Sequence, residues 1–196
     1  GFELADLLAH PDQRLRLEVQ RELASRGDVG AFEGVLRYAD ERAARLHAIW
    51  GLGQIARGAS KKKRAEAMEP VLAHLRDGDS EVRAQAAKVL GDPPVSAAVS
   101  ELIEALSDAE PRVRYHAAMS LGAIKSTDAI PFLVGLLMEN NGRDRHLQHA
   151  ASTALWKIGD RAQLVELSAH PMGAVRMGAL LALRRTNDPA LERMLF

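Results

Sequence analysis

Two of the seven histidines are spaced so that they could share a metal ion. His146 and His149 lie three residues apart, which places both on one face of a helix, and Asp144 lies close by in the sequence. Two imidazoles and a carboxylate could bind zinc or iron. The opposing interpretation is that both are solvated side chains at the start of a helix, and no His-Glu-x-x-His motif accompanies them. The sequence favours this second interpretation, and we expect no metal and no other cofactor.

Other common catalytic arrangements are also missing from the sequence. The chain contains no cysteine, which excludes thiolate catalysis, disulfides and Cys-ligated zinc within it. The glycines Gly51 and Gly53 fall inside an expected helix rather than in a phosphate-binding loop. Serines, histidines and aspartates show no nucleophile-elbow context. We therefore expect that the chain is not an enzyme.

The charge balance bears on the choice of partner. Lys and Arg number 26 and Asp and Glu number 26, so the formal net charge is zero. A surface that binds nucleic acid in general needs an excess of positive charge, so a neutral chain argues against this function. The basic run from Lys61 to Arg64 could touch phosphate, but a short run of this kind is usually a solvated helix start. No apolar stretch is long enough for a transmembrane helix, so we expect no membrane insertion.

An internal repeat organises the chain. Six segments align on an anchor position, which is Arg in five of them: Arg16, Arg45, Arg83, Arg114, Gln148 and Arg176. A leucine stands seven residues after each anchor, and an acid stands four residues before each anchor except the last. We expect the acid to favour the helix N-terminus and to pair with the arginine one turn later. In the fourth segment, Val113, Ala117, Leu121 and Ile124 then share one buried face.

A second amphipathic helix precedes each later anchored helix. The expected ranges are Val29 to Tyr38, Arg64 to Arg76, Val95 to Leu106, Asp128 to Met138 and Arg161 to Ser168. Gly91-Asp92-Pro93-Pro94 should end the third anchored helix early. Helix pairs at this period must stack to bury both faces. The sequence thus predicts an all-α fold, a right-handed α-solenoid of about six helix pairs. We expect one domain over 1–196, with repeats at about 1–27, 28–58, 61–92, 95–126, 127–159 and 160–186 and a short terminal helix at 189–195.

The anchored helices also carry a stripe of side chains that points away from the core. In a stacked solenoid this stripe would line a concave groove, and its aromatic members are typical of binding surfaces. The alternative is that the tryptophans fill gaps between repeats. The expected partner-binding residues are His47, Trp50, Gln54, Gln85, Lys88, Tyr115, His116 and Met119.

The segments DSEVRAQAAKVLG and EPRVRYHAAMSLG resemble the HEAT repeat, in the short form found in phycobilin lyase-like proteins. The phrases LLAHPDQRLRLEVQRELASRGD and AVRMGALLALRRTNDPALERML are similar, more narrowly, to the HEAT segment of exported planctomycete-type proteins that fuse a dehydrogenase-like propeller to a c-type cytochrome domain. This narrower resemblance implies a segment of a larger exported redox protein, with a periplasmic or exported location.

These observations support three functional hypotheses. The first is a non-catalytic scaffold whose groove binds a protein segment or a neighbouring domain. The second, implied by the HEAT resemblance, is a phycobilin lyase-like protein that handles a tetrapyrrole. The third and weakest is nucleic-acid binding, and we expect no nucleic-acid partner.

Overall fold

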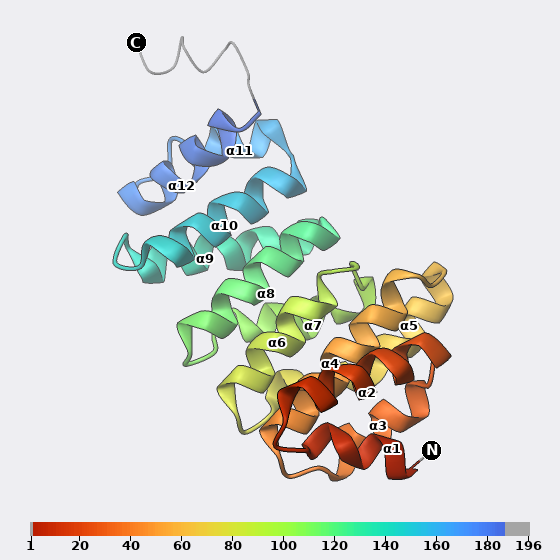
Figure 1. Cartoon of the computed structure of the whole chain (residues 1–196). Coiled ribbons are helices and arrows are strands. Elements are labelled where there is room, and N and C mark those ends of the chain that lie inside the picture. The colour runs from red at the N-terminus through yellow and green to blue at the C-terminus, as the bar shows by residue number, and fades with distance from the viewer. Residues whose placement is uncertain (1, 187–196) are drawn as a thin grey trace. The chain divides into compact units, whose positions relative to one another are not determined.

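The computed structural model describes residues 2–186, and every regular element in that range is helical (Figure 1). The α helices are α1 (Phe2–Asp6), α2 (Gln13–Arg26), α3 (Val29–Tyr38), α4 (Arg42–Arg57), α5 (Lys61–Leu72), α6 (Ser80–Leu90), α7 (Val99–Ala105), α8 (Pro111–Ile124), α9 (Ile130–Asn140), α10 (Arg145–Ile158), α11 (Arg161–Leu167) and α12 (Gly173–Arg184). Short 3-10 helices are η1 (Leu7–Ala9), η2 (Ala73–Arg76), η3 (Ser96–Ala98) and η4 (Thr127–Ala129). The all-helical prediction is confirmed, and the expected terminal helix at 189–195 lies outside the described residues.

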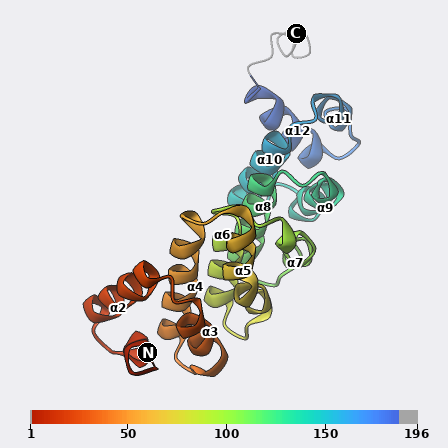
Figure 2. The same ribbon diagram turned by 90° about the vertical axis from the view of Figure 1, so that its right-hand side faces the viewer.

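The chain divides into two compact units, Gly1–Ala98 and Val99–Phe196. In the first unit α4 packs against α2, α3, α5 and α6, as Figure 2 shows. The anchored helices α2, α4 and α6 therefore form one layer, and η1, α3 and α5 lie against it. Each pair buries the faces that a single helix could not cover.

The second unit repeats the same arrangement with three further pairs. Helix α10 packs against α8 and α12, and α7, α9 and α11 each pack against their own anchored helix. Val113, Ala117 and Leu121 of α8 are fully buried, as the repeat predicts, whereas Ile124 is half-buried. Small residues allow α8 and α10 to approach closely, since a Cβ atom on Gly122 would lie 2.6 Å from the Cα atom of Ala154.

The anchor arginines stabilise the turn that precedes their own helix. Arg45 Nη1 donates to the carbonyl oxygens of Ala39 and Asp40 at 3.0 and 2.9 Å. The same pair of bonds recurs at Arg16, Arg83, Arg114 and Arg176, always to the residues six and five positions earlier. We expected these arginines to pair with the acid one turn earlier. The turn carbonyls accept from the guanidinium instead, because they lie in the turn before the helix and need a donor from outside the helical hydrogen bonds.

The acids before the anchors act on the backbone. The carboxylate of Asp79 accepts from the N–H groups of Glu81 and Val82, and Asp12 and Asp144 cap their helices in the same way. Glu41 and Glu110 occupy the same position without a side-chain cap bond. His10 and His170 also cap backbone, because each Nδ1 accepts from the N–H group two residues later.

The boundaries of three helices differ from the sequence-based expectation, and α9 spans Ile130–Asn140 rather than Asp128 to Met138. Helix α5 begins at Lys61 rather than Arg64, because the basic run itself forms the first turn. Helix α7 begins at Val99 rather than Val95, after the 3-10 turn η3. Helix α6 ends at Leu90, before the two prolines, as expected. Within residues 2–186, no helix combines the length and the hydropathy that crossing a membrane requires.

Candidate functional site

The anchored helices of the first unit are joined by a chain of polar and aromatic contacts. His47 on α4 lies between two side chains of α2: its Nδ1 is 2.7 Å from Gln20 Oε1, and its Nε2 accepts from Arg16 Nε at 3.2 Å. Both His47 and Gln20 are only 3% exposed. Gln20 offers an oxygen and Arg16 offers an N–H, so the contacts select the neutral imidazole with its proton on Nδ1.

The chain continues from α4 to α6 through Trp50. Its ring meets the His47 ring edge-on, with centroids 5.1 Å apart, and its Nε1 donates to Gln85 Oε1 at 3.0 Å. Gln85 Nε2 in turn donates to Glu81 Oε1 at 2.8 Å. We call these six side chains the polar ladder: Arg16, Gln20, His47, Trp50, Gln85 and Glu81. The ladder fixes the indole of Trp50 in one orientation on the face of α4.

The ladder also controls the protonation of His47. Burial, followed by the positive charge of Arg16, lowers the pKa of His47 below its usual value. Protonation would place an N–H against the Arg16 N–H donor and would put two cations side by side. The contacts therefore hold His47 neutral and make it unsuited to bind an anion.

The structure places the expected groove residues of the first unit in three environments. His47 and Gln85 are buried and face neighbouring helices, Trp50 is half-buried, and Gln54 and Lys88 are exposed. Polar atoms of the buried pair are already bonded within the chain. An incoming partner could therefore contact part of the Trp50 ring and the side chains of Gln54 and Lys88.

The remaining expected groove residues belong to the second unit. Tyr115, His116 and Met119 of α8 are all half-buried. The rings of Tyr115 and His116 meet edge-on with centroids 5.2 Å apart. This pair presents aromatic surface on α8.

The candidate metal ligands His146 and His149 are both exposed on α10. The Asp144 carboxylate accepts from the backbone N–H of His146, so it acts as a helix cap. Nδ1 of His149 lies 3.4 Å from an Arg185 nitrogen. Across residues 2–186, no group of three or more potential metal-binding side chains comes together.

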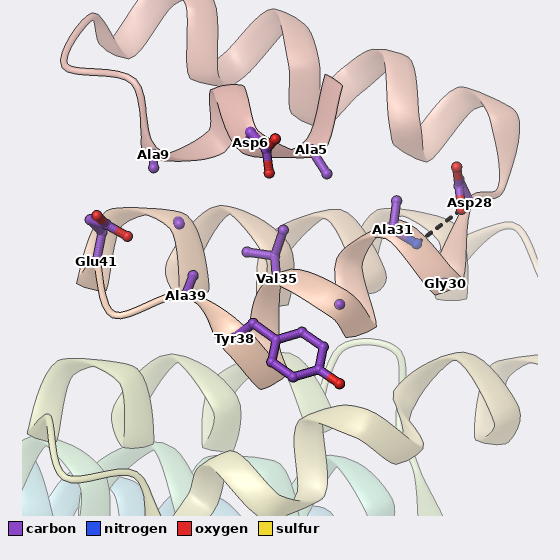
Figure 3. A pocket seen from close by; sticks show the side chains of 12 residues that line it. Ala5, Asp6, Ala9, Asp28, Gly30, Ala31, Val35, Tyr38, Ala39 and Glu41 are labelled. Carbon is purple, nitrogen blue, oxygen red and sulfur yellow. Dashed lines mark hydrogen bonds between the residues drawn. The ribbon is translucent and has the colours of Figure 1, made fainter. Parts of the chain in front are cut away.

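A pocket that the repeat pattern did not predict lies beside η1 in the first unit (Figure 3). Its volume is about 690 Å³, and it opens between the N-terminal helices and α3. Small apolar side chains dominate the lining, and Tyr38, which is 75% exposed, stands at its edge. The complete lining is Ala5, Asp6, Ala9, Asp28, Gly30, Ala31, Gly34, Val35, Tyr38, Ala39, Glu41 and Ala44.

Three carboxylates add polar groups to this apolar pocket. Asp28 also caps α3, because its Oδ1 accepts from the Ala31 N–H at 3.0 Å. Asp6 and Glu41 are exposed at the rim. The pocket thus combines an apolar wall with hydrogen-bond acceptors at its rim, which suits an apolar ligand that carries N–H donors.

Comparisons with known proteins find similar helical repeats in other proteins. The HEAT-repeat family model matches residues 68–147. Phycocyanobilin lyase subunit alpha from Picosynechococcus sp. is 29% identical over 174 residues, which cover 79% of this chain and 63% of that protein. The bilin biosynthesis protein PecE from Mastigocladus laminosus is 34% identical over 111 residues, or 53% of this chain and 39% of that protein. The chain thus spans less than two thirds of either curated relative.

Solved structures of helical-repeat proteins are also similar to this chain. The CpcE–CpcF complex of phycocyanin lyase from Nostoc sp. PCC7120 contains a chain that is 26% identical, with a TM-score of 0.64 over 85% of this chain and 68% of that one. A designed armadillo repeat protein in complex with the peptide (KR)4 is similar in fold, with 19% identity and a TM-score of 0.60 over 93% of this chain and 97% of that one. The chain is therefore an α-solenoid that is similar to HEAT-repeat proteins and to phycobilin lyase subunits.

These relatives correct one expectation. We expected the chain not to be an enzyme, because no familiar catalytic constellation is present. That expectation is wrong, since its relatives are subunits of bilin lyases. Catalysis by holding a reactant in a productive geometry needs no nucleophile or metal site, so a motif search does not detect it.

Proposed function

We propose that the chain binds a bilin, an open-chain tetrapyrrole, as one subunit of a lyase-type assembly. The observation that carries this proposal is its similarity to phycobilin lyase subunits along 79% and 85% of its length. This is the tetrapyrrole-handling alternative from the sequence. It replaces the non-catalytic scaffold as the main function.

The pocket beside η1 is the candidate bilin site. Its volume of about 690 Å³ falls in the range of small-molecule pockets. The small side chains of Ala5, Ala31 and Gly34 leave room for a ligand between the N-terminal helices and α3. The carboxylates of Asp6 and Glu41 can accept from pyrrole N–H groups.

The composition defines how such a ligand would be held. The chain has no cysteine, so it cannot form a thioether to the bilin itself. Binding in the pocket must therefore be non-covalent, and the bilin can leave for an acceptor. This property suits a subunit that binds and orients a chromophore for transfer.

A second protein chain is part of the proposal. The related phycocyanin lyase structure is a complex of two proteins, CpcE and CpcF. In this chain the exposed side of Trp50, with Gln54 and Lys88, offers an aromatic and polar contact surface. The polar ladder holds that indole still, which reduces the entropy lost on docking.

A matched pair of glycine variants tests the pocket. Gly34 lines the pocket and Gly135 lies outside it on α9, and a Cβ atom at either position meets nothing within 4 Å. Gly34→Leu should fill the pocket without unfolding α3, whereas Gly135→Leu adds the same side chain elsewhere. Biliverdin is titrated into each protein and binding is followed by visible absorbance.

We expect a saturable spectral change with the wild type and with Gly135→Leu. Gly34→Leu should bind biliverdin at least about tenfold more weakly, which corresponds to a loss of roughly 1.4 kcal/mol of binding free energy. Absence of a spectral change with the wild type would contradict bilin binding. Equal affinity of the two variants would contradict the pocket as its site.

The narrower resemblance to the HEAT segment of exported dehydrogenase–cytochrome fusions stays a prediction. A Cys-x-x-Cys-His motif in the sequence that flanks this segment would support it.

A further inference from the structure

The two helical layers of the second unit carry opposite charge. Helices α8, α10 and α12 contain six Arg and Lys residues and no Asp or Glu; the cations are Arg112, Arg114, Arg145, Lys157, Arg176 and Arg184. The paired helices α7, α9 and α11 contain four Glu and one Arg; these are Glu101, Glu104, Glu139, Glu166 and Arg161. The formal net charge of zero over the whole chain hides this separation.

Two of these cations have a structural role, and two others, at the ends of α10 and α12, are exposed to solvent. Arg114 and Arg176 donate to the carbonyl oxygens of the preceding turns. Arg145 and Arg184 are exposed, and so is Arg185, the residue that caps α12. Helices α8, α10 and α12 therefore carry an excess of positive charge even when the arginines that bond to the turn carbonyls are left out of the count.

A cluster between α10 and α12 gives this face a binding centre. The guanidinium of Arg185 donates to the hydroxyl of Thr153 and lies 3.4 Å from His149 Nδ1. The same guanidinium lies 5.8 Å from the centroid of the Trp156 ring. Since His149, Thr153 and Trp156 are spaced along one face of α10, they hold the Arg185 charge over an aromatic surface.

Apolar side chains lie beside these charges. Trp156 is 36% exposed, and Met177 of α12 is 49% exposed. Trp, Arg and Met are the side chains that protein interfaces prefer at their centres. A ligand that matches this face needs carboxylates for the arginines and at least one apolar group for Trp156 and Met177.

We infer that the α8–α10–α12 face docks an acidic segment of a partner protein that carries an apolar side chain among its carboxylates. A protein segment fits better than a nucleic acid, because the cations are spread over three helices and large apolar side chains interrupt them. The inference does not depend on bilin binding, and its test contains no bilin.

Fluorescence anisotropy with a labelled acidic peptide tests this inference on the full chain. The probe is a short peptide of Glu residues with one central Leu, and two further probes replace Glu by Gln or the peptide by single-stranded poly(U). Arg185→Glu and Trp156→Ala alter the cluster. Lys61→Glu is the control, because it makes the same charge reversal at an exposed position of the other unit. Circular dichroism checks that each variant keeps its helices.

The acidic peptide should bind in a salt-dependent manner, and Arg185→Glu should weaken it about tenfold or more, as expected for loss of one charge-assisted contact. Trp156→Ala should weaken it by a smaller factor, and Lys61→Glu should leave it unchanged. Equal binding of the Gln peptide, tighter binding of poly(U), or an equal loss with Lys61→Glu would each overturn the inference.

Discussion

Replacing His47 is the perturbation for which the structure makes the most detailed prediction. The imidazole holds α4 to α2 through Gln20 and Arg16. His47→Ala removes both bonds and leaves Gln20, which is 3% exposed, with a buried oxygen that has lost its donor. A lost bond costs about 1 kcal/mol and a stranded buried acceptor a further 1–3 kcal/mol, so the unfolding free energy should fall by about 2–4 kcal/mol.

His47→Gln provides the control for this substitution. A glutamine amide also offers one donor and acceptor pair, so it can bond to both Gln20 and Arg16. We expect it to cost only about 1 kcal/mol, because its shape differs from the imidazole. The difference between the two variants measures the bonds rather than the loss of volume alone.

The wild type should also lose stability in mild acid through this residue. Because the fold lowers the pKa of His47, the unfolded chain takes up a proton there more readily than the folded chain. Its contribution to stability is fully present above the ordinary histidine value of about 6.5, and it is lost as the pH falls from that value towards the lower folded pKa. The slope from this one proton reaches at most about 1.4 kcal/mol per pH unit.

Urea unfolding followed by tryptophan fluorescence measures both effects. Trp156→Phe in every protein leaves Trp50 as the only tryptophan, so the signal reports on the ladder. Measurements above and below the ordinary histidine pKa then compare the wild type with His47→Gln. Equal loss of stability in acid for these two proteins, or a His47→Ala cost below about 0.5 kcal/mol, would refute the reasoning.

Three further substitutions follow from individual contacts. Gly122→Ala should lower the unfolding free energy by about 1–3 kcal/mol, because its Cβ would meet backbone of α10. Gly135→Ala should be neutral or stabilise the chain by up to about 1 kcal/mol. Equal melting temperatures of the two variants would contradict this prediction. Arg114→Gln should cost about 1–2 kcal/mol by releasing two turn carbonyls, and the exposed Arg145→Gln should cost almost nothing in the same denaturant titration. Trp50→Phe keeps the ring but loses the indole bond, so thermal unfolding should show a loss of about 1 kcal/mol, and no change would mean that water replaces that bond fully.

The fold was predictable from sequence because the repeat records the same local geometry six times. A buried stripe such as Val113, Ala117 and Leu121 requires only helical periodicity, and the structure buries all three. The partner of each anchor arginine was not predictable in this way. A spacing of four residues fits an ion pair as well as it fits a turn, and the carbonyl geometry that decides between them is visible only in the folded chain.

The candidate site was harder to predict because its contacts join residues far apart in the sequence. His47 and Gln20 are 27 residues apart, and Trp50 and Gln85 are 35 apart. The stripe predicted that His47 and Trp50 share a face, but it did not predict that a neighbouring helix covers His47. The pocket depends on where η1 and α3 lie, and no motif marks it.

The distribution of charge among the helices is a further signal in the sequence. Net charge over the whole chain is zero, yet a count for each helix finds no acid in α8, α10 or α12. A neutral total therefore excludes a uniformly basic surface but not a basic layer on one unit. Charge should be counted for each helical layer in repeat proteins of this kind.

The central claim is that a bilin binds beside η1, and hydrogen exchange tests it directly. Exchange of the whole chain is measured with and without biliverdin and read by mass spectrometry. A bilin bound there should slow exchange in α3 and in the turn before α4, which carry most of the pocket lining. Unchanged exchange in these segments, or protection confined to the second unit, would contradict it.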